Sequence, residues 1–276
     1  MLTPLVTTDW LKNNLNNPKL IILDASMSDN KSGQNSDLGD VQIKNARFFD
    51  LKNSFSDKES SLPNMLPSEV SFTKACQDLG INTDSIIVVY DNLGVYSSPR
   101  VWWMFKAMGH DDIAVLDGGL PKWAEDGFPT EPIQAGTYPK GTFIANFRQN
   151  MVKNATDILK NIDHKEALVI DARSSGRFCG TEPEPRADLK GGHIPGSLNL
   201  PYTDVIKDGQ FLPPDHLKQI FEKLQLEDHS LVFTCGSGLT ACIILLASEL
   251  VQKNPTAVYD GSWTEWGQLN GVPIIT

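Results

Sequence analysis

Cys235 lies in a sequence setting that can activate a thiol. The apolar run 231–233 leads through Thr234 into Cys235, and Gly236 and Gly238 come soon after it. Glycines allow backbone angles that other residues resist, so successive N–H groups can point into one concavity. The apolar stretch 240–250 predicts a helix whose positive end faces that concavity. Both features stabilise an anion on sulfur, so the sequence predicts a nucleophilic Cys235 thiolate.

The other cysteines predict neither a metal site nor a redox pair. Cys76, Cys179 and Cys242 are scattered and lack the glycine-rich setting, so we expect structural or incidental roles for them. Cysteines so arranged give no disulfide framework and no zinc-ligand spacing, and we expect no metal and no cofactor. No second cysteine lies at the Cys-x-x-Cys spacing of thiol–disulfide oxidoreductases. A cysteine phosphatase needs an arginine six residues after its cysteine, and Ala241 occupies that position here.

Matched features recur in the same order in the two halves of the chain. The pairs are Asp24-Ala25 with Asp171-Ala172, Tyr90-Asp91 with Thr234-Cys235, and Asp117-Gly118-Gly119 with Asp260-Gly261-Ser262. The offsets from 24 to 171, from 91 to 235 and from 117 to 260 are 147, 144 and 143 residues. Such a nearly constant offset indicates one ancestral domain present twice. Because Asp91 matches Cys235, we predict a catalytic C-terminal copy and a non-catalytic N-terminal copy.

Each half alternates short apolar runs with stretches of helical length. In the first half, the run 86–89 precedes the stretch 99–108. Continuous apolar strands followed by helices indicate an α/β fold, with a mainly parallel central sheet flanked by helices in each half. Glycine, proline and polar residues interrupt this pattern near the middle of the chain. We therefore predict an N-terminal domain over 1–134, a linker over 135–153 and a catalytic domain over 154–276.

The charge balance limits the class of partner. The chain has 24 lysines and arginines against 34 aspartates and glutamates, a formal net charge of -10. A nucleic-acid binder normally shows a basic excess, and an anionic membrane surface attracts basic segments, so we expect neither partner. The apolar runs are too short to span a membrane, and the N-terminus lacks the basic and apolar regions of a secretion signal. These features predict a cytoplasmic protein.

The motifs at these positions resemble those of a known family. Residues 235–241 read Cys-Gly-Ser-Gly-Leu-Thr-Ala, 182–186 read Glu-Pro-Glu-Pro-Arg, and 192–196 read Gly-His-Ile-Pro-Gly. Together with the duplication, these motifs resemble the tandem rhodanese-type sulfurtransferases over nearly the whole chain, which implies two tandem rhodanese-like domains. The cysteine loop is similar to that of the 3-mercaptopyruvate sulfurtransferase branch. Thiosulfate-preferring members typically carry basic residues where this chain has Gly236 and Ser237.

The resemblance implies sulfur transfer through a covalent intermediate. Cys235 would take sulfur from 3-mercaptopyruvate as a persulfide and release pyruvate. A thiol such as thioredoxin or a low-molecular-weight thiol, or cyanide, would then collect the sulfur. Ser237 would act beside Cys235 by hydrogen-bonding the substrate or relaying a proton. The residues expected to bind substrate are the two arginines, which suit a keto acid, and those of the loop, whose N–H groups suit a sulfur anion: Arg177, Arg186, Gly236, Gly238, Leu239, Thr240 and Ala241.

Two positions depart from the family pattern. Members proposed to use a serine–histidine–aspartate relay have a histidine where this chain has Asn64 and an acid where it has Lys52. The activation of Ser237 therefore stays open, and this serine is equally well explained as a turn residue. Two other functions also stay open, namely a thiosulfate sulfurtransferase and a non-catalytic sulfur-carrier or interaction protein.

Overall fold

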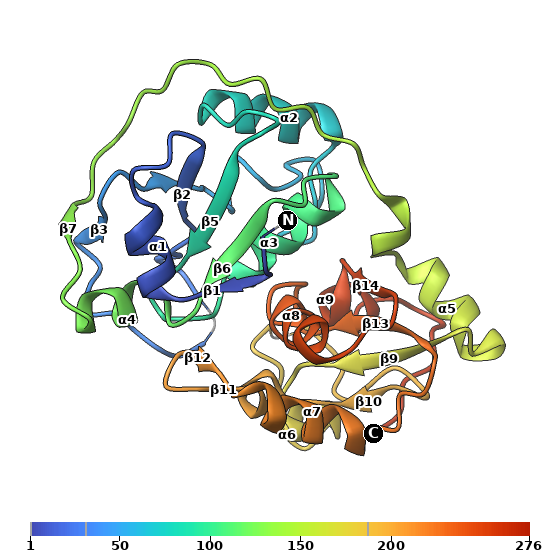
Figure 1. Cartoon of the computed structure of the whole chain (residues 1–276). Helices are drawn as coiled ribbons and strands as arrows, with labels where there is room; N and C mark the ends of the chain where they lie inside the picture. The colour runs from blue at the N-terminus through green and yellow to red at the C-terminus, as the bar shows by residue number, and fades with distance from the viewer. Residues whose placement is uncertain (1, 31, 187) are drawn as a thin grey trace. The chain divides into compact units, whose positions relative to one another are not determined.

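A computed structural model describes residues 2–30, 32–186 and 188–276. The chain divides into two compact units (Figure 1). The N-terminal unit contains Met1–Lys58, Leu66–Arg148 and Asp208–Phe211, and the C-terminal unit contains Glu59–Met65, Gln149–Lys207 and Leu212–Thr276. Each unit is described by itself below.

The N-terminal unit is built on a parallel five-stranded sheet. Its strands, in spatial order, are β1 (Leu5–Val6), β6 (Ile113–Leu116), β5 (Ile86–Tyr90), β2 (Leu20–Asp24) and β4 (Arg47–Phe48). Its helices are α1 (Thr8–Asn14), α2 (Glu69–Asp78), α3 (Ser98–Ala107) and α4 (Gly119–Glu125), and β3 (Val41–Ile43) pairs antiparallel with β7 (Thr130–Pro132). Because β2 and β5 are buried along their length, they read as continuous apolar runs rather than alternating ones.

The C-terminal unit repeats this strand order. Its parallel sheet runs β8 (Val152–Lys153), β14 (Thr256–Tyr259), β13 (Ser230–Thr234), β9 (Ala167–Asp171) and β10 (Leu198–Asn199). Its helices are η1 (Gln149–Met151), α5 (Ala155–His164), α6 (Ser175–Phe178), η2 (Tyr202–Asp204), α7 (Pro214–Lys223), α8 (Ala241–Val251) and α9 (Ser262–Trp266). A further short strand of this unit is β11 (Ile206–Lys207), whereas the short strand β12 (Gln210–Phe211) belongs to the N-terminal unit. The predicted fold class, two α/β copies with parallel central sheets, is confirmed.

Helices cover both faces of the C-terminal sheet. On one face, α8 packs against β13 and β14, and α7 packs against α8. On the other face, Ile158 of α5 and Trp263 and Trp266 of α9 form a cluster with Val232 and the neighbouring strands. Residues 241–248 of α8 are all buried, which explains why the stretch is apolar on every side. Within the described part of the chain, no helix is long and apolar enough to cross a membrane.

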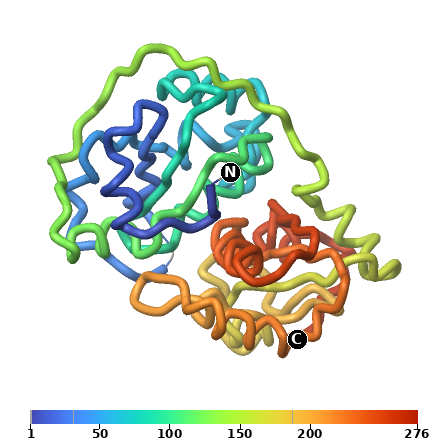
Figure 2. Tube along the Cα trace, in the orientation of Figure 1, coloured from blue at the N-terminus to red at the C-terminus, as the bar shows by residue number. Residues whose placement is uncertain are grey.

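Residues 133–148, between β7 and η1, follow the surface of the N-terminal unit. Figure 2 traces this segment as an extended run with little regular structure. Backbone N–H groups of Gly141, Phe143 and Asn146 donate to carbonyls of that unit at 2.8, 3.0 and 2.8 Å. Arg148 then pairs with Asp111 through two hydrogen bonds of 2.8 and 2.7 Å. These bonds hold the segment in place up to the point where η1 begins.

Candidate active site

Cys235 lies at the carboxyl-terminal edge of the C-terminal sheet. It directly follows β13 and is separated from α8 by the loop 236–240. The residue is 1% exposed. The neighbouring strand β9 ends at Asp171 on the same edge, because β9 and β13 are parallel and in register from Ser230 to Thr234. In parallel α/β sheets this edge is where loops and helix N-termini form binding sites.

The cysteine loop is anchored by Ser262 at the start of α9. The Ser262 hydroxyl accepts the backbone N–H groups of Cys235 and Gly238 at 3.2 and 3.1 Å and donates to the Tyr259 carbonyl at 2.8 Å. The N–H of Trp263 donates to the Cys235 carbonyl at 2.9 Å. The sequence marked Ser262 only as part of a repeated motif and missed this role. The sequence feature that could have indicated this role is the motif Asp260-Gly261-Ser262, because it directly follows β14, the strand next to β13.

The remaining N–H groups of the loop are available to an anion. Among the described residues, the backbone N–H groups of Gly236, Ser237, Leu239, Thr240 and Ala241 have no acceptor. Buried or half-buried N–H groups normally find a partner, so donors left open in the loop that follows Cys235 indicate a place for negative charge.

Gly238 makes a different contribution to the loop. Its N–H is already bonded to Ser262, and its φ of +75° is in the left-handed region that favours glycine. Gly238 therefore serves the loop through its backbone conformation, while its neighbours supply the open donors.

The matching loop of the N-terminal unit holds an anionic group of its own. The Asp91 Oδ2 accepts the N–H groups of Tyr96, Ser97 and Ser98, each at 2.9 Å, and the Ser98 hydroxyl at 2.7 Å. Burial raises the pKa of the Asp91 carboxyl, and these hydrogen bonds oppose the rise. With the repeat offset of 144 residues, these three donors match the start of α8. The comparison of the two loops indicates that the backbone of this motif is built to surround an acidic side chain.

A buried chain of charges reaches the cysteine loop from the end of β9. Arg173 binds the Asp171 carboxylate through Nε at 2.9 Å and Nη2 at 2.6 Å, and binds Glu184 Oε1 through Nη1 at 2.8 Å. Burial alone would lower the pKa of Arg173, but the charges and hydrogen bonds of Asp171 and Glu184 raise it. Sequence reasoning missed Arg173, and it treated Glu184 only as part of a motif.

Both arginines expected from the sequence lie beside the loop. Arg177 donates to Glu184 Oε2, and its Nη2 lies 3.1 Å from where a β-carbon on Gly236 would stand. Arg186 donates to the Thr264 hydroxyl at 3.1 Å, and that hydroxyl donates to the Gly236 carbonyl at 2.6 Å. The structure therefore places Arg177 next to Gly236 and links Arg186 to the same glycine through Thr264.

The two departures from the family pattern have different surroundings. Asn64 donates through Nδ2 to the Ser237 hydroxyl at 3.2 Å and to the Ser237 carbonyl at 3.3 Å. An amide cannot take up a proton as a histidine does, so this contact orients Ser237 without activating it. Lys52 forms an exposed ion pair with Asp29 at 3.0 Å in the N-terminal unit.

The comparisons with known proteins agree with this architecture. Residues 7–126 and 154–269 each match the family described as the rhodanese-like domain. The chain belongs to this family. Its two rhodanese domains carry Asp91 and Cys235 at matching positions.

Relatives named for two different sulfur donors have the same sequence identity to this chain. It is 38% identical to the 3-mercaptopyruvate sulfurtransferase of Rattus norvegicus over 272 residues, covering 95% of this chain and 91% of the relative. It is also 38% identical over 272 residues to the thiosulfate sulfurtransferase of Mus musculus, with the same two coverages. Among solved structures, the rhodanese-fold crystal structure of SseA from Escherichia coli superposes with a TM-score of 0.83 at 35% identity, covering 95% of this chain and 99% of that one.

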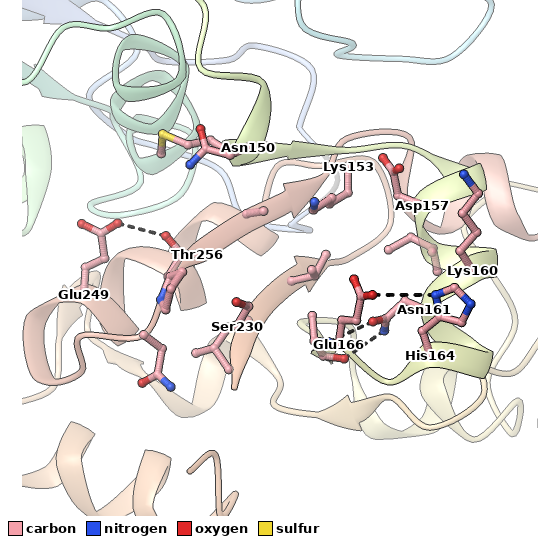
Figure 3. A pocket seen from close by; sticks show the side chains of 18 residues that line it. Asn150, Lys153, Asp157, Lys160, Asn161, His164, Glu166, Ser230, Glu249 and Thr256 are labelled. Atoms are coloured by element: carbon pink, nitrogen blue, oxygen red, sulfur yellow. Dashed lines mark hydrogen bonds and ion pairs between the residues drawn. The ribbon is translucent and has the colours of Figure 1, made fainter. Parts of the chain in front are cut away.

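A separate cavity of about 680 Å³ lies in the C-terminal rhodanese domain (Figure 3). Its lining comes from η1, β8, α5, the starts of β9, β13 and β14, and Glu249 of α8. It includes Lys153, Asp157, Lys160 and Glu166. It lies at the amino end of β13, whereas Cys235 follows the carboxyl end, so it is not part of the cysteine site. Across the described ranges, no cluster of three or more histidine, cysteine, aspartate or glutamate side chains could hold a metal ion.

Proposed function

We propose that this rhodanese-family chain is a 3-mercaptopyruvate sulfurtransferase in which Cys235 carries sulfur as a persulfide. The observation that carries the proposal is the set of open N–H donors in the loop after the buried Cys235, with Arg177 and Arg186 beside the same loop. Two proteins named for this activity are covered over 91% and 99% of their lengths, and the second superposes with a TM-score of 0.83.

In the first half-reaction, the Cys235 thiolate attacks the sulfur of 3-mercaptopyruvate. A sulfur–sulfur bond forms, and the carbon–sulfur bond of the donor breaks. The released electron pair becomes the enolate of pyruvate, which takes a proton from water or from the donor's own thiol. Arg177 and Arg186 offset the charge on the carboxylate and the enolate oxygen, because guanidinium groups match these oxygens geometrically.

The loop N–H groups act in both half-reactions. Those of Leu239, Thr240 and Ala241 stabilise first the thiolate and then the outer sulfur of the persulfide, without reorganisation between the two states. In the second half-reaction, an acceptor thiol or cyanide attacks that outer sulfur and restores the Cys235 thiolate. Thioredoxin and low-molecular-weight thiols are acceptors of suitable chemistry.

Ser237 serves as a hydrogen-bonding group rather than as a relay. Asn64 donates to its hydroxyl, so the Ser237 hydroxyl hydrogen can point toward the substrate. This arrangement supports binding of the donor's carbonyl or carboxylate oxygen and requires no histidine.

Thiosulfate is the second candidate donor, since a relative of equal identity is named for it. Gly236 favours 3-mercaptopyruvate, because thiosulfate-preferring members of the family typically carry a basic side chain here, and a β-carbon at this position would lie 3.1 Å from Arg177 Nη2. A ratio of turnover on the two donors distinguishes the candidates, and a clear preference for thiosulfate would reverse this choice.

Intact-mass measurement after addition of 3-mercaptopyruvate tests the proposal. We expect the wild-type chain to gain one sulfur atom and release pyruvate, and Cys235→Ser to do neither. Cys179→Ser is the matched control, because Cys179 is exposed and lies outside the loop. Absence of both the mass gain and pyruvate in the wild type would instead support a non-catalytic interaction protein.

A further inference from the structure

We propose that Glu184 is a positioning residue that fixes the Arg177 guanidinium beside Gly236 and thereby sets the affinity for a carboxylate-bearing donor. The inference rests on the proposed function of Cys235 and assigns a task to a buried acid that the mechanism above does not use.

Glu184 divides its two carboxylate oxygens between two arginines. Its Oε1 accepts Nη1 of Arg173 at 2.8 Å, and its Oε2 accepts Nε and Nη2 of Arg177 at 3.2 and 2.6 Å. The Glu184 side chain is 1% exposed. A buried carboxylate with both oxygens engaged cannot rotate without leaving charges unpaired, so its orientation is fixed.

Arg173 ties this carboxylate to the rigid part of the unit. Its side chain is 0% exposed and binds Asp171 at the end of β9 and the Gly192 carbonyl at 2.8 Å. Its guanidinium carbon lies 4.0 Å from the centre of the Trp263 ring, a cation–π contact. Glu184 is therefore held by a strand end and an aromatic ring rather than by a surface side chain.

Arg177 is the end of this chain of charges that can meet a ligand. Its side chain is 22% exposed, whereas those of Glu184 and Arg173 are buried. Within the described residues, its Nη1 has no acceptor. The bond from Nη2 to Glu184 therefore leaves one edge of the guanidinium open, next to the loop that carries Cys235.

The order of charges explains how the carboxylate of Glu184 can favour the binding of an anionic donor. The charges along the chain alternate in sign, in the order Asp171, Arg173, Glu184 and Arg177. Because Glu184 is buried, it holds the Arg177 guanidinium without itself facing the donor. Without the Glu184 charge, the Arg177 side chain gains rotamers, and the donor must then restrict them on binding.

Steady-state kinetics of Glu184→Gln test the proposal. We expect the KM for 3-mercaptopyruvate to rise about tenfold, the size of a lost charged hydrogen bond, while kcat stays within about twofold. Glu182→Gln is the matched control, because Glu182 belongs to the same motif but is exposed and accepts from Ser174. An unchanged KM in Glu184→Gln would overturn the proposal.

Alkylation of Cys235 provides a readout that does not need turnover. Iodoacetate carries a carboxylate and iodoacetamide does not. The ratio of their alkylation rates at Cys235 therefore measures how strongly Arg177 attracts a carboxylate to the site. We expect Glu184→Gln to lower this ratio severalfold with the iodoacetamide rate unchanged. An equal fall in both rates would show a general structural defect and would contradict a positioning role.

A double-mutant cycle separates this inference from the proposed function. In an Arg177→Gln background, Glu184→Gln should change KM no further, and an independent additional loss would contradict the coupling. Glu184→Asp keeps the charge one methylene shorter, and we expect an intermediate KM if Glu184→Gln fails to fold. If the wild type gains no sulfur, the proposed function fails. A lower ratio of iodoacetate to iodoacetamide rates in Glu184→Gln would still support the positioning of Arg177 in that case.

Discussion

The Oδ2 atom of Asp91 accepts both the backbone N–H and the side-chain hydroxyl of Ser98, at 2.9 and 2.7 Å. Asp91 occupies the place in the first rhodanese domain that Cys235 occupies in the second. The loop of the first domain thus surrounds a side chain that cannot carry sulfur, which makes its role one of stability.

Asp91→Ala should destabilise the chain by about 3 kcal/mol, because several buried donors lose one shared acceptor. Asp91→Asn keeps one acceptor oxygen and should lose less. Chemical denaturation with two probes measures the free energy of unfolding, with Asp37→Ala, at an exposed position, as the control. Pyruvate release at a temperature well below the transition should be unchanged. Equal stability of Asp91→Ala and the control would contradict the assignment.

Gly236→Ala should raise the KM for the donor about fivefold, as expected when a few tenths of an ångström of displacement weaken a charged contact. The added β-carbon would lie 3.1 Å from Arg177 Nη2, so the guanidinium must move. Gly39→Ala is the matched control, because its nearest neighbouring atom is 3.9 Å away. A melting temperature like that of the wild type, together with the raised KM, would locate the effect in the site. A KM equal to that of the control would contradict it.

Asp111→Asn should destabilise the chain at neutral pH by about 1 kcal/mol, the scale of a partly exposed ion pair. Hydrogen bonding to Arg148, aided by Lys106, holds the pKa of Asp111 well below its usual range. The lowered pKa means that this stability is present above the unfolded-state value near 4 and is lost as the pH falls below it. The difference in unfolding free energy between wild type and Asp111→Asn should therefore shrink at low pH. A difference independent of pH, or one equal to that of the exposed control Asp163→Asn, would rule out this cause.

Local pattern was sufficient for the fold, whereas the role of Cys235 as nucleophile stays a prediction. The apolar run 86–89 is the core of β5, and the stretches 99–108 and 240–250 lie within one or two residues of α3 and α8. These predictions succeed because a strand buried on both faces must be apolar throughout, and because a glycine-rich turn before a helix leaves N–H groups open. The repeat supplied the contrast between Asp91 and Cys235.

The tertiary structure decided which side chains meet. Arg173 and Glu184 are 11 residues apart and Arg186 and Thr264 are 78 apart, and no local periodicity pairs them. Asn64 reaches Ser237 across 173 residues of chain. Such contacts depend on how strand ends and loops come together at one edge of a sheet. A hydrogen bond or ion pair there forms only when the two groups lie within about 3 Å of each other. The sequence by itself therefore determined the repeat, the strands and the loop setting of Cys235, whereas the arrangement of charges beside that loop follows only from the folded chain.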